Sequence, residues 1–360
     1  NGVLPLTKEA FWNKDESTVA VFGNQASTPT VGGGGSGEVT PSWLPTPLAT
    51  IHATLAQADY GVESDNVFFG GDDSTVGEMK RLASKADVCF FYMATSASEG
   101  GDRDNLSLDE DTYVSDVAPS CAKSVAVVTT PGAILMPWAD QVDAILVNFM
   151  PGVAAAFATM DVVVGDVNPS ARLPITMPMV ENQEGFTTEQ YPGLDDALNS
   201  TYTEKWAFGY RYYHLHNEQP RFWFGEGLSY ADFKLDTDSL TWHKEDKVTA
   251  KVTNAGSVAG AVVPQLYLTL PKACEQPIYM LKGIEKLTLD AGESQTVTFE
   301  LTERDFSTWD VDAFDWAKCT GDYTARVSLT GANFGWDYNP DVPNDDGVAQ
   351  QTFADVTRTI

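Results

Sequence analysis

The chain has 360 residues, and 43% of them are hydrophobic, which is enough to build the cores of two ordinary domains. Its 51 acidic and 22 basic residues give a formal net charge of −29 at pH 7. This balance argues against nucleic acids and anionic membranes as partners, because both are bound through basic patches. The acidic residues are scattered, as in a solvated surface, and no apolar run reaches the roughly 18 residues that a membrane-spanning helix needs.

The N-terminal part alternates strand-like and helix-like segments. The opening residues, Asn1–Leu6, are neither an initiator Met nor a signal peptide, so the sequence is expected to begin inside a larger precursor or at a processed end. Short apolar runs predict strands that are buried on both faces. They are residues 18–23, 87–92, 124–129 and 144–149. Helix-length segments between the strands include residues 47–58 and 76–84.

Strands that alternate with helices predict an α/β sandwich over residues 1–178, with a mostly parallel sheet covered by helices on both faces. Ligands of such sheets bind beyond the carboxyl ends of the strands, so the loops that follow the strands are the candidate sites.

Two loops of this part draw attention. Val31–Gly37 follows a strand and precedes a helix, but it lacks the signatures of a P-loop or a dinucleotide-binding loop, so a flexible turn lining a cleft is expected. Ser98–Leu106 follows the strand that ends near Met93, where such a sheet presents its chemistry. Glu99 stands there among small residues that let a sugar approach closely. Taken alone, an acid beside glycine in a loop is most often a solvated turn residue.

The segment 179–229 is polar, rich in Tyr and low in periodicity, and it is predicted to connect two domains. Residues 230–360 are predicted to form an antiparallel β-sandwich, because short alternating strands follow one another with glycine-containing turns. The clearest strands are residues 247–254, 263–268, 296–301 and 323–328.

The four cysteines show no C-x-x-C spacing, which argues against a zinc site. Cys89 lies in an apolar run and is predicted to be a buried thiol. Cys274 and Cys319 fall in loops of the predicted β-sandwich, and a disulfide bridge between them is expected if the protein is secreted. The sequons at Asn105 and Asn199 are compatible with secretion.

Other candidate sites are less favoured. His214-x-His216 is expected to be a solvated loop pair, so no metal and no cofactor is predicted. Ser36 and Ser98 have no suitable His and Asp partners, which disfavours a hydrolase triad. The many Tyr and Trp residues are interpreted as core and corner residues before sugar-stacking ones.

A series of short motifs occurs in one order along nearly the whole chain. They are residues 1–6, 19–24, 32–37, 98–103, 137–138, 151–152, 165–170, 172–174, 209–213, 224–230, 281–286 and 304–310. Together they resemble the C-terminal half of family 3 glycoside hydrolases. The resemblance implies an α/β sandwich followed by an immunoglobulin-like, fibronectin-III-like sandwich, without the family's catalytic barrel.

The same resemblance implies retaining hydrolysis of a β-glycoside, which uses a nucleophilic Asp in the barrel and an acid/base Glu in the sandwich-domain loop. Glu99 is the residue at the matching position, three residues before the Asp of Gly-Asp-Arg. Asp102 and Arg103 are expected to hold that loop in shape. The nucleophile and most sugar-binding residues would lie in the absent barrel, so substrate-binding residues stay unknown.

Two departures from the family pattern affect what can be expected. Residues 153–157 replace a Gln-Glu-Gly-Gly type of turn, and Ala171 replaces the usual Gly before Arg172. One interpretation is part of a secreted β-glucosidase-like or β-xylosidase-like exo-glycosidase, whose barrel is supplied in cis or in trans. The alternative is a non-catalytic extracellular module that binds carbohydrate or has a structural role, because a fold does not fix a function.

Overall fold

The structure is a computed structural model that describes residues 2–12, 17–57, 62–71, 73–194, 199–244, 246–334 and 353–360. The chain divides into an α/β unit, Asn1–Val167 with Met179–Glu181, and a β unit, Asn168–Pro178 with Asn182–Ile360. Both predicted fold classes are confirmed. The boundaries expected at residues 178 and 229 stay predictions. No helix in the described ranges is long and apolar enough to cross a membrane.

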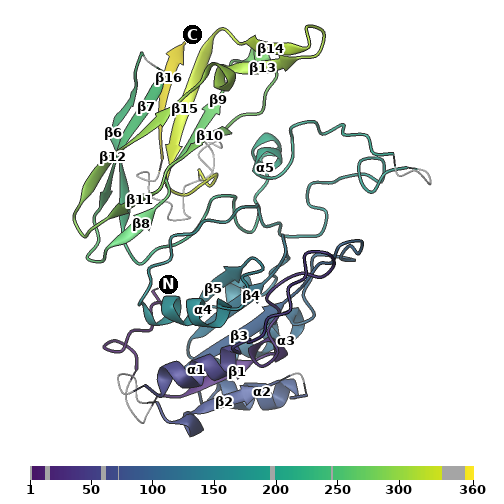
Figure 1. Cartoon of the computed structure of the whole chain (residues 1–360), viewed down its shortest axis with the longest axis vertical. Helices are drawn as coiled ribbons and strands as arrows, with labels where there is room; N and C mark the ends of the chain where they lie inside the picture. The colour runs from purple at the N-terminus through teal and green to yellow at the C-terminus, as the bar shows by residue number, and fades with distance from the viewer. Residues whose placement is uncertain are drawn as a thin grey trace. The chain divides into compact units, whose positions relative to one another are not determined.

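The α/β unit is built on a five-stranded parallel sheet with the order β2-β1-β3-β4-β5 (Figure 1). Its strands are β1 (Val19–Phe22), β2 (Val67–Gly70), β3 (Val88–Ala94), β4 (Ser124–Thr129) and β5 (Ala144–Asn148). All of β1 and most of β3 are buried, as their continuous apolar sequences predict.

Helices cover both faces of this sheet. α1 (Pro47–Leu55) packs with α4 (Ala155–Val164), and α2 (Val76–Ala83) packs with α3 (Asp111–Val117) (Figure 1). Short 3₁₀ helices complete the unit: η1 (Asn24–Ala26), η2 (Ser64–Asn66), η3 (Ala118–Ser120) and η4 (Ala139–Gln141). α2 begins with a capping box, in which Thr75 and Glu78 satisfy each other's backbone N–H groups.

The strand order creates one position where neighbouring strands lead in opposite directions. From β1 the chain continues to β2 on one side, whereas from β3 it continues to β4 on the other side. This is a topological switch point, where open α/β sheets bind ligands beyond the carboxyl ends of the strands. The loops after β1 and β3 therefore meet at the place where chemistry is expected.

The β unit consists of antiparallel sheets with the orders β10-β9-β15-β16, β12-β7-β6, β11-β8 and β13-β14. Its strands are β6 (Phe233–Trp242), β7 (Lys247–Asn254), β8 (Gly260–Val262), β9 (Gln265–Thr269), β10 (Met280–Ile284), β11 (Leu287–Leu289), β12 (Ser294–Glu300), β13 (Ser307–Asp310), β14 (Asp315–Lys318), β15 (Asp322–Ser328) and β16 (Phe353–Thr359). Alternating side chains of β7, β9, β12 and β15 fill a common core.

The tyrosine at the start of β15 ties this core to the backbone. The Tyr323 hydroxyl lies 2.8 Å from the carbonyl oxygen of Phe306 and 2.9 Å from that of Cys319. A tyrosine whose hydroxyl bonds to backbone a few residues upstream is a recurrent feature of immunoglobulin-like sandwiches.

The segment after residue 181 belongs to the β unit by its contacts and contains a helix that the sequence did not predict, α5 (Tyr210–His216). The side chain of Tyr213 is buried in an aromatic cluster with Trp223, Tyr267, Tyr279 and Phe334. A further short 3₁₀ helix, η5 (Lys272–Cys274), follows β9, and η6 (Glu303–Phe306) precedes β13.

The cysteines form two disulfide bridges, and none of them is free. The expected bridge between Cys274 and Cys319 is confirmed, with Cα atoms 6.0 Å apart. The prediction of a free thiol at Cys89 is wrong, because Cys89 is bonded to Cys121. The pairing of β3 with β4 places Cys89 opposite Ser124, which brings the preceding loop with Cys121 within reach. Burial was predicted correctly, but the partner depends on strand pairing.

Candidate active site

The glycine-rich loop after β1 and the Ser98–Arg103 loop after β3 lie side by side. The amide of Gly34 donates to the carbonyl oxygen of Ala97 at 3.0 Å, and the amide of Glu99 donates to that of Gly34 at 3.4 Å. Gly34 and Ser98 form an isolated parallel bridge. Two segments more than 60 residues apart in the sequence thus form one surface at the switch point.

The close approach of these loops requires glycine. A Cβ atom on Gly35 would lie 2.4 Å from the Cβ of Glu99, and one on Gly33 would lie 2.8 Å from the carbonyl oxygen of Ala97. Gly35 also has a φ of +87°, which side-chain-bearing residues rarely adopt. The glycines therefore allow one loop to pack on the other, a role that goes beyond the expected flexible turn.

Glu99 is exposed, and one residue of the glycine-rich loop holds its carboxylate. The amide of Ser36 donates to Oε2 at 2.8 Å, and the Ser36 hydroxyl donates to the same oxygen. These contacts, the hydroxyl bond first and the amide bond second, lower the pKa of Glu99 below its ordinary value. The carboxyl group is therefore ionised at neutral pH in this chain.

Arg103 and Asp102 differ in their contacts. Arg103 is partly buried and donates from Nη2 to the carbonyl oxygen of Ala133 at 2.9 Å, which links the Glu99 loop to the loop after β4. This contact fits the expected support role. Asp102 is exposed and has no hydrogen bond or ion pair among the residues that the structure describes, and its role stays a prediction.

A small cavity lies beyond the carboxyl ends of β3, β4 and β5. It is lined in part by Tyr92, Thr129, Asn148 and Thr159, and its volume is about 20 Å³. This space is large enough for a water molecule, whereas a sugar ring needs a pocket of several hundred Å³. Within the described α/β unit, this cavity does not provide a sugar-sized binding site.

Comparisons with known proteins identify the family of the chain. The family model described as "Glycosyl hydrolase family 3 C-terminal domain" matches residues 1–230. The chain belongs to glycoside hydrolase family 3. A second model, "Fibronectin type III-like domain", matches residues 262–329 of this family 3 chain.

The curated relatives of this family 3 chain are about twice as long as it is. "Probable beta-glucosidase G" of Emericella nidulans is 34% identical over 92% of this chain, which spans 46% of that protein. "Probable beta-glucosidase D" of Aspergillus niger is 34% identical over 72% of this chain and 37% of its own length. The chain thus spans about half, or less, of the length of these relatives.

A solved structure shows the same architecture. The family 3 β-glucosidase of Bifidobacterium adolescentis is 29% identical to this chain with a TM-score of 0.82, and the match covers 100% of this chain and 50% of that one. DesR, a β-glucosidase of Streptomyces venezuelae, has a TM-score of 0.83 at 24% identity over 99% of this chain and 57% of its own length, a likeness in fold.

The sequence analysis of this family 3 chain did not identify Ser36 as a hydrogen-bond donor to the carboxylate of Glu99. The residue was considered only as a nucleophile, and its contact with Glu99 joins positions 63 residues apart. The strand order could have revealed this contact. The glycine-rich loop follows β1 and the Glu99 loop follows β3, and these two strands are neighbours at the switch point.

The backbone near the two departures from the family 3 pattern keeps ordered hydrogen bonds, although Met150, just before the first of them, has a φ of +46°. Gly152 still adopts a positive φ of +77°, and the amide of Ala155 donates to its carbonyl oxygen at 3.3 Å as α4 begins. Beside Ala171, the amide of Leu173 donates to the carbonyl oxygen of Glu226 at 2.8 Å.

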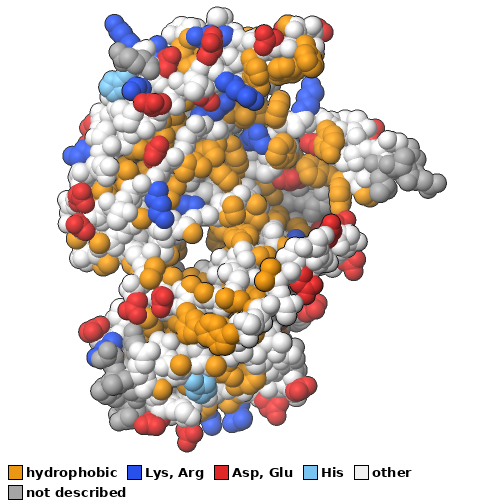
Figure 2. All heavy atoms as spheres, viewed as in Figure 1, with side chains coloured by type: hydrophobic (Ala, Val, Ile, Leu, Met, Phe, Trp, Pro, Cys, Tyr) orange, Lys and Arg blue, Asp and Glu red, His pale blue; other side chains and the backbone are white. Residues whose placement is uncertain are grey.

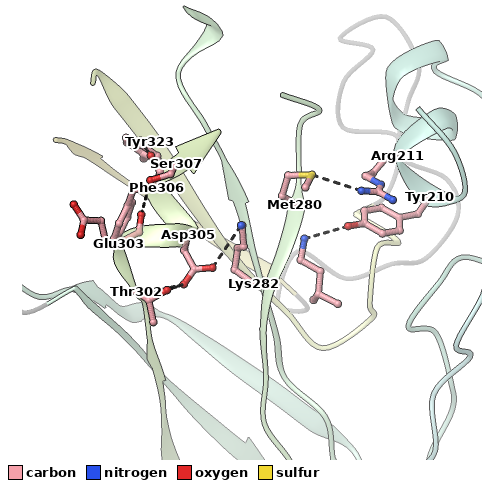
Figure 3. A network of polar contacts seen from close by, with 11 residues as sticks. Tyr210, Arg211, Met280, Lys282, Thr302, Glu303, Asp305, Phe306, Ser307 and Tyr323 are labelled. Atoms are coloured by element: carbon pink, nitrogen blue, oxygen red, sulfur yellow. Dashed lines mark hydrogen bonds and ion pairs between the residues drawn. The ribbon is translucent and has the colours of Figure 1, made fainter. Parts of the chain in front are cut away.

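The family 3 motifs of the β unit make structural contacts. The Nζ of Lys282 lies 3.4 Å from Oδ1 of Asp305 (Figure 3). The Oδ2 of Asp305 accepts hydrogen bonds from the amide and the hydroxyl of Thr302, both at 2.8 Å, and so caps η6. The amide of Leu281 donates to the Tyr210 hydroxyl at 3.1 Å. These contacts join β10 to η6 and to α5, and we assign them a structural role.

The histidine pair lies on α5, so the expectation of a solvated loop is wrong for His214. Its ring stacks on Trp223 and Phe334 at centroid distances of 4.5 and 5.1 Å, and its Nε2 lies 2.9 Å from the carbonyl oxygen of Ala332. His216 is exposed. No group of three or more potential ligands for a metal ion occurs among the described residues.

Some aromatic residues are exposed, although the sequence favoured core positions for them. Trp43 and Phe157 stack on each other at 5.8 Å, with 61% and 42% of their surfaces accessible. Figure 2 shows that acidic side chains on the visible face occur in separate small groups on each unit, as the scattered sequence pattern predicts.

Proposed function

We propose that this chain is part of a retaining exo-β-glycosidase and supplies Glu99 as its general acid/base. A barrel domain outside the given sequence, in cis or in trans, would provide the nucleophile and most sugar contacts. The observation that carries the proposal is an exposed carboxylate at the switch point of a family 3 sheet, held by two donors on an adjoining loop. The β-glucosidase relatives favour a β-glucoside substrate, and a β-xyloside is the second candidate.

A retaining mechanism requires this residue to act first as an acid and then as a base. In the first step the acid gives a proton to the leaving oxygen while a second carboxylate, about 5–5.5 Å away, attacks the anomeric carbon. In the second step the resulting carboxylate takes a proton from water. The Ser36 contacts favour the ionised form, and a neighbouring carboxylate from the barrel would raise the pKa again by like-charge repulsion.

The decisive test is Glu99→Gln in the full-length enzyme, because the amide keeps the shape and removes the proton. Turnover of an unactivated disaccharide is expected to fall by about 10²–10⁴-fold, and turnover of an activated aryl glycoside much less. Glu99→Ala should be rescued by azide, which can attack the intermediate where no carboxylate repels it.

Glu38→Gln is the matched control, since Glu38 is also exposed and its amide bonds to Gly35 in the same loop. If Glu99→Gln keeps wild-type activity on the disaccharide, Glu99 is a loop residue. The acid would then have to be sought at Glu38 or Glu110, and the non-catalytic alternative would gain weight.

We further propose an extracellular location. Two disulfide bridges support it, because such bridges persist in oxidising compartments. Asn105 is exposed within its sequon, and its Oδ1 accepts a bond from the amide of Ser107 at 2.9 Å. A mass shift of the native protein after enzymatic removal of N-glycans would support this location, and its absence together with free thiols would contradict it.

A further inference from the structure

Ser36 donates two hydrogen bonds to one oxygen of Glu99. Its amide lies 2.8 Å from Oε2, and its hydroxyl donates to that same atom. Among the described residues no donor contacts Oε1. The two oxygens of the carboxylate therefore stand in different environments, although a free carboxylate makes them equivalent.

The two Ser36 donors occupy both acceptor positions of Oε2, so a proton on that oxygen would displace one of these hydrogen bonds. When the carboxyl group carries a proton, that proton belongs on Oε1. We propose that Ser36 is a positioning residue, which anchors Oε2 of Glu99 and thereby assigns proton transfer to Oε1. This inference rests on the proposed function of Glu99.

The assignment fits both steps of the reaction. In the first, the proton on Oε1 moves to the glycosidic oxygen as the bond from that oxygen to the anomeric carbon breaks and the nucleophile bonds to the carbon. In the second, Oε1 takes a proton from water as the water oxygen bonds to the anomeric carbon and the nucleophile leaves. Between the steps Glu99 is a carboxylate, the form that the two Ser36 donors stabilise.

The backbone around Ser36 makes this anchor possible. Gly35 has a φ of +87° and lies so close that a Cβ atom there would be 3.0 Å from the Glu99 amide and 2.4 Å from its Cβ. The bridge between Gly34 and Ser98 fixes the register of the two loops, two residues before Ser36 and one residue before Glu99. Ser36 is thus aligned with Glu99 by contacts that do not involve the carboxylate.

The anchor can be tested without any activity, by following the carboxyl ¹³C resonance of Glu99 in the 360-residue chain during a pH titration. The Glu99→Gln spectrum assigns the resonance. In Ser36→Ala the residue is expected to titrate at higher pH than in the wild type, because a donor to the ionised form is lost. Ser36→Thr, which keeps the hydroxyl, should restore the wild-type titration.

Ser98→Ala is the matched control, since the Ser98 hydroxyl donates to the backbone carbonyl oxygen of Glu99 at 3.4 Å and, among the described residues, makes no hydrogen bond to the Glu99 carboxylate. It should leave the titration unchanged. A Ser36→Ala chain that titrates like the wild type, or a Ser98→Ala chain that shifts as far as Ser36→Ala, would overturn the proposal.

In the full-length enzyme, Ser36→Ala is expected to lower kcat about tenfold, a small part of the 10²–10⁴-fold that acid/base catalysis contributes. The basic limb of the pH profile of kcat/KM, where Glu99 loses its proton, should move to higher pH and return in Ser36→Thr. Lower activity with an unmoved limb would mean a merely structural role and would refute the assignment. Wild-type activity of Glu99→Gln would refute the proposed function instead. The titration would still show whether Ser36 stabilises the ionised form of Glu99, because it does not depend on activity.

Discussion

His214 is a neutral imidazole enclosed by aromatic rings. Burial is the main cause that lowers its pKa to about 4, the hydrogen bond to Ala332 opposes this, and the charge of Arg326 adds to it. The ring stacks on Trp223 and Phe334, so protonation would place a charge among apolar groups. Protonation of His214 is therefore expected to destabilise the fold.

The stability of the β unit should therefore depend on pH through His214. Between its unfolded pKa of 6.5 and its folded pKa of about 4, the unfolded chain binds the proton more tightly. The free energy of unfolding is expected to fall as the pH is lowered through this window. Urea unfolding monitored by tryptophan fluorescence at several pH values measures the effect, and His214→Phe should remove that part of it.

The control is His216→Phe on the same helix, because the side chain of His216 is exposed. It should keep the pH dependence of the wild type. Equal pH dependence in the wild type and in His214→Phe would show that His214 does not contribute.

At the scale of elements, each unit has one disulfide bridge that closes a long stretch of chain. The Cys89–Cys121 bridge joins positions 32 residues apart, and the Cys274–Cys319 bridge joins positions 45 residues apart. The chain-entropy model assigns about 4 kcal/mol to closing loops of this length. Each bridge thus contributes a sizeable fraction of the stability of an ordinary domain.

Replacing Cys89 and Cys121 together by Ala should lower the thermal midpoint of the α/β unit and leave the β unit nearly unchanged. The reverse is expected when Cys274 and Cys319 are replaced. Calorimetry of both double variants, with the wild type in reductant for comparison, tests this. A single transition that shifts equally in both variants would show that the two units unfold together.

The sequence was most informative where a segment's own pattern decides its structure. The continuous apolar runs at β1, β3, β4 and β5 and the alternation in β7 and β15 predicted these strands. Short elements such as β2 and β13 were missed, because their few residues carry little periodicity. The Cys89–Cys121 bridge and the Ser36–Glu99 contact depend on which strands become neighbours, and no local pattern encodes that.

At the scale of the whole molecule, the proposed function assigns to the given sequence one of the two carboxylates that a retaining glycosidase requires. The purified 360-residue chain is therefore expected to show no hydrolysis of nitrophenyl β-glucoside or β-xyloside. Adding the barrel domain of a family 3 β-glucosidase should produce activity if that domain associates with this chain.

Turnover by the isolated chain would contradict the proposed division, provided that contaminating full-length enzyme is excluded by a Glu99→Gln preparation made in parallel. Activity that persists in that preparation would identify the contaminant. Activity that disappears with Glu99 would require a nucleophile within these 360 residues.

The pairing of the two loops at the switch point affects how such enzymes can be recombined. Gly35 fits against Glu99 only without a side chain, and Gly34 bridges to Ser98, so neither loop tolerates an arbitrary neighbour. A graft of residues 97–103 from a relative should therefore succeed only when residues 31–37 come from the same donor. The two segments should therefore be exchanged together, although residues 38–96, which contain α1, β2, α2 and β3, separate them in the sequence.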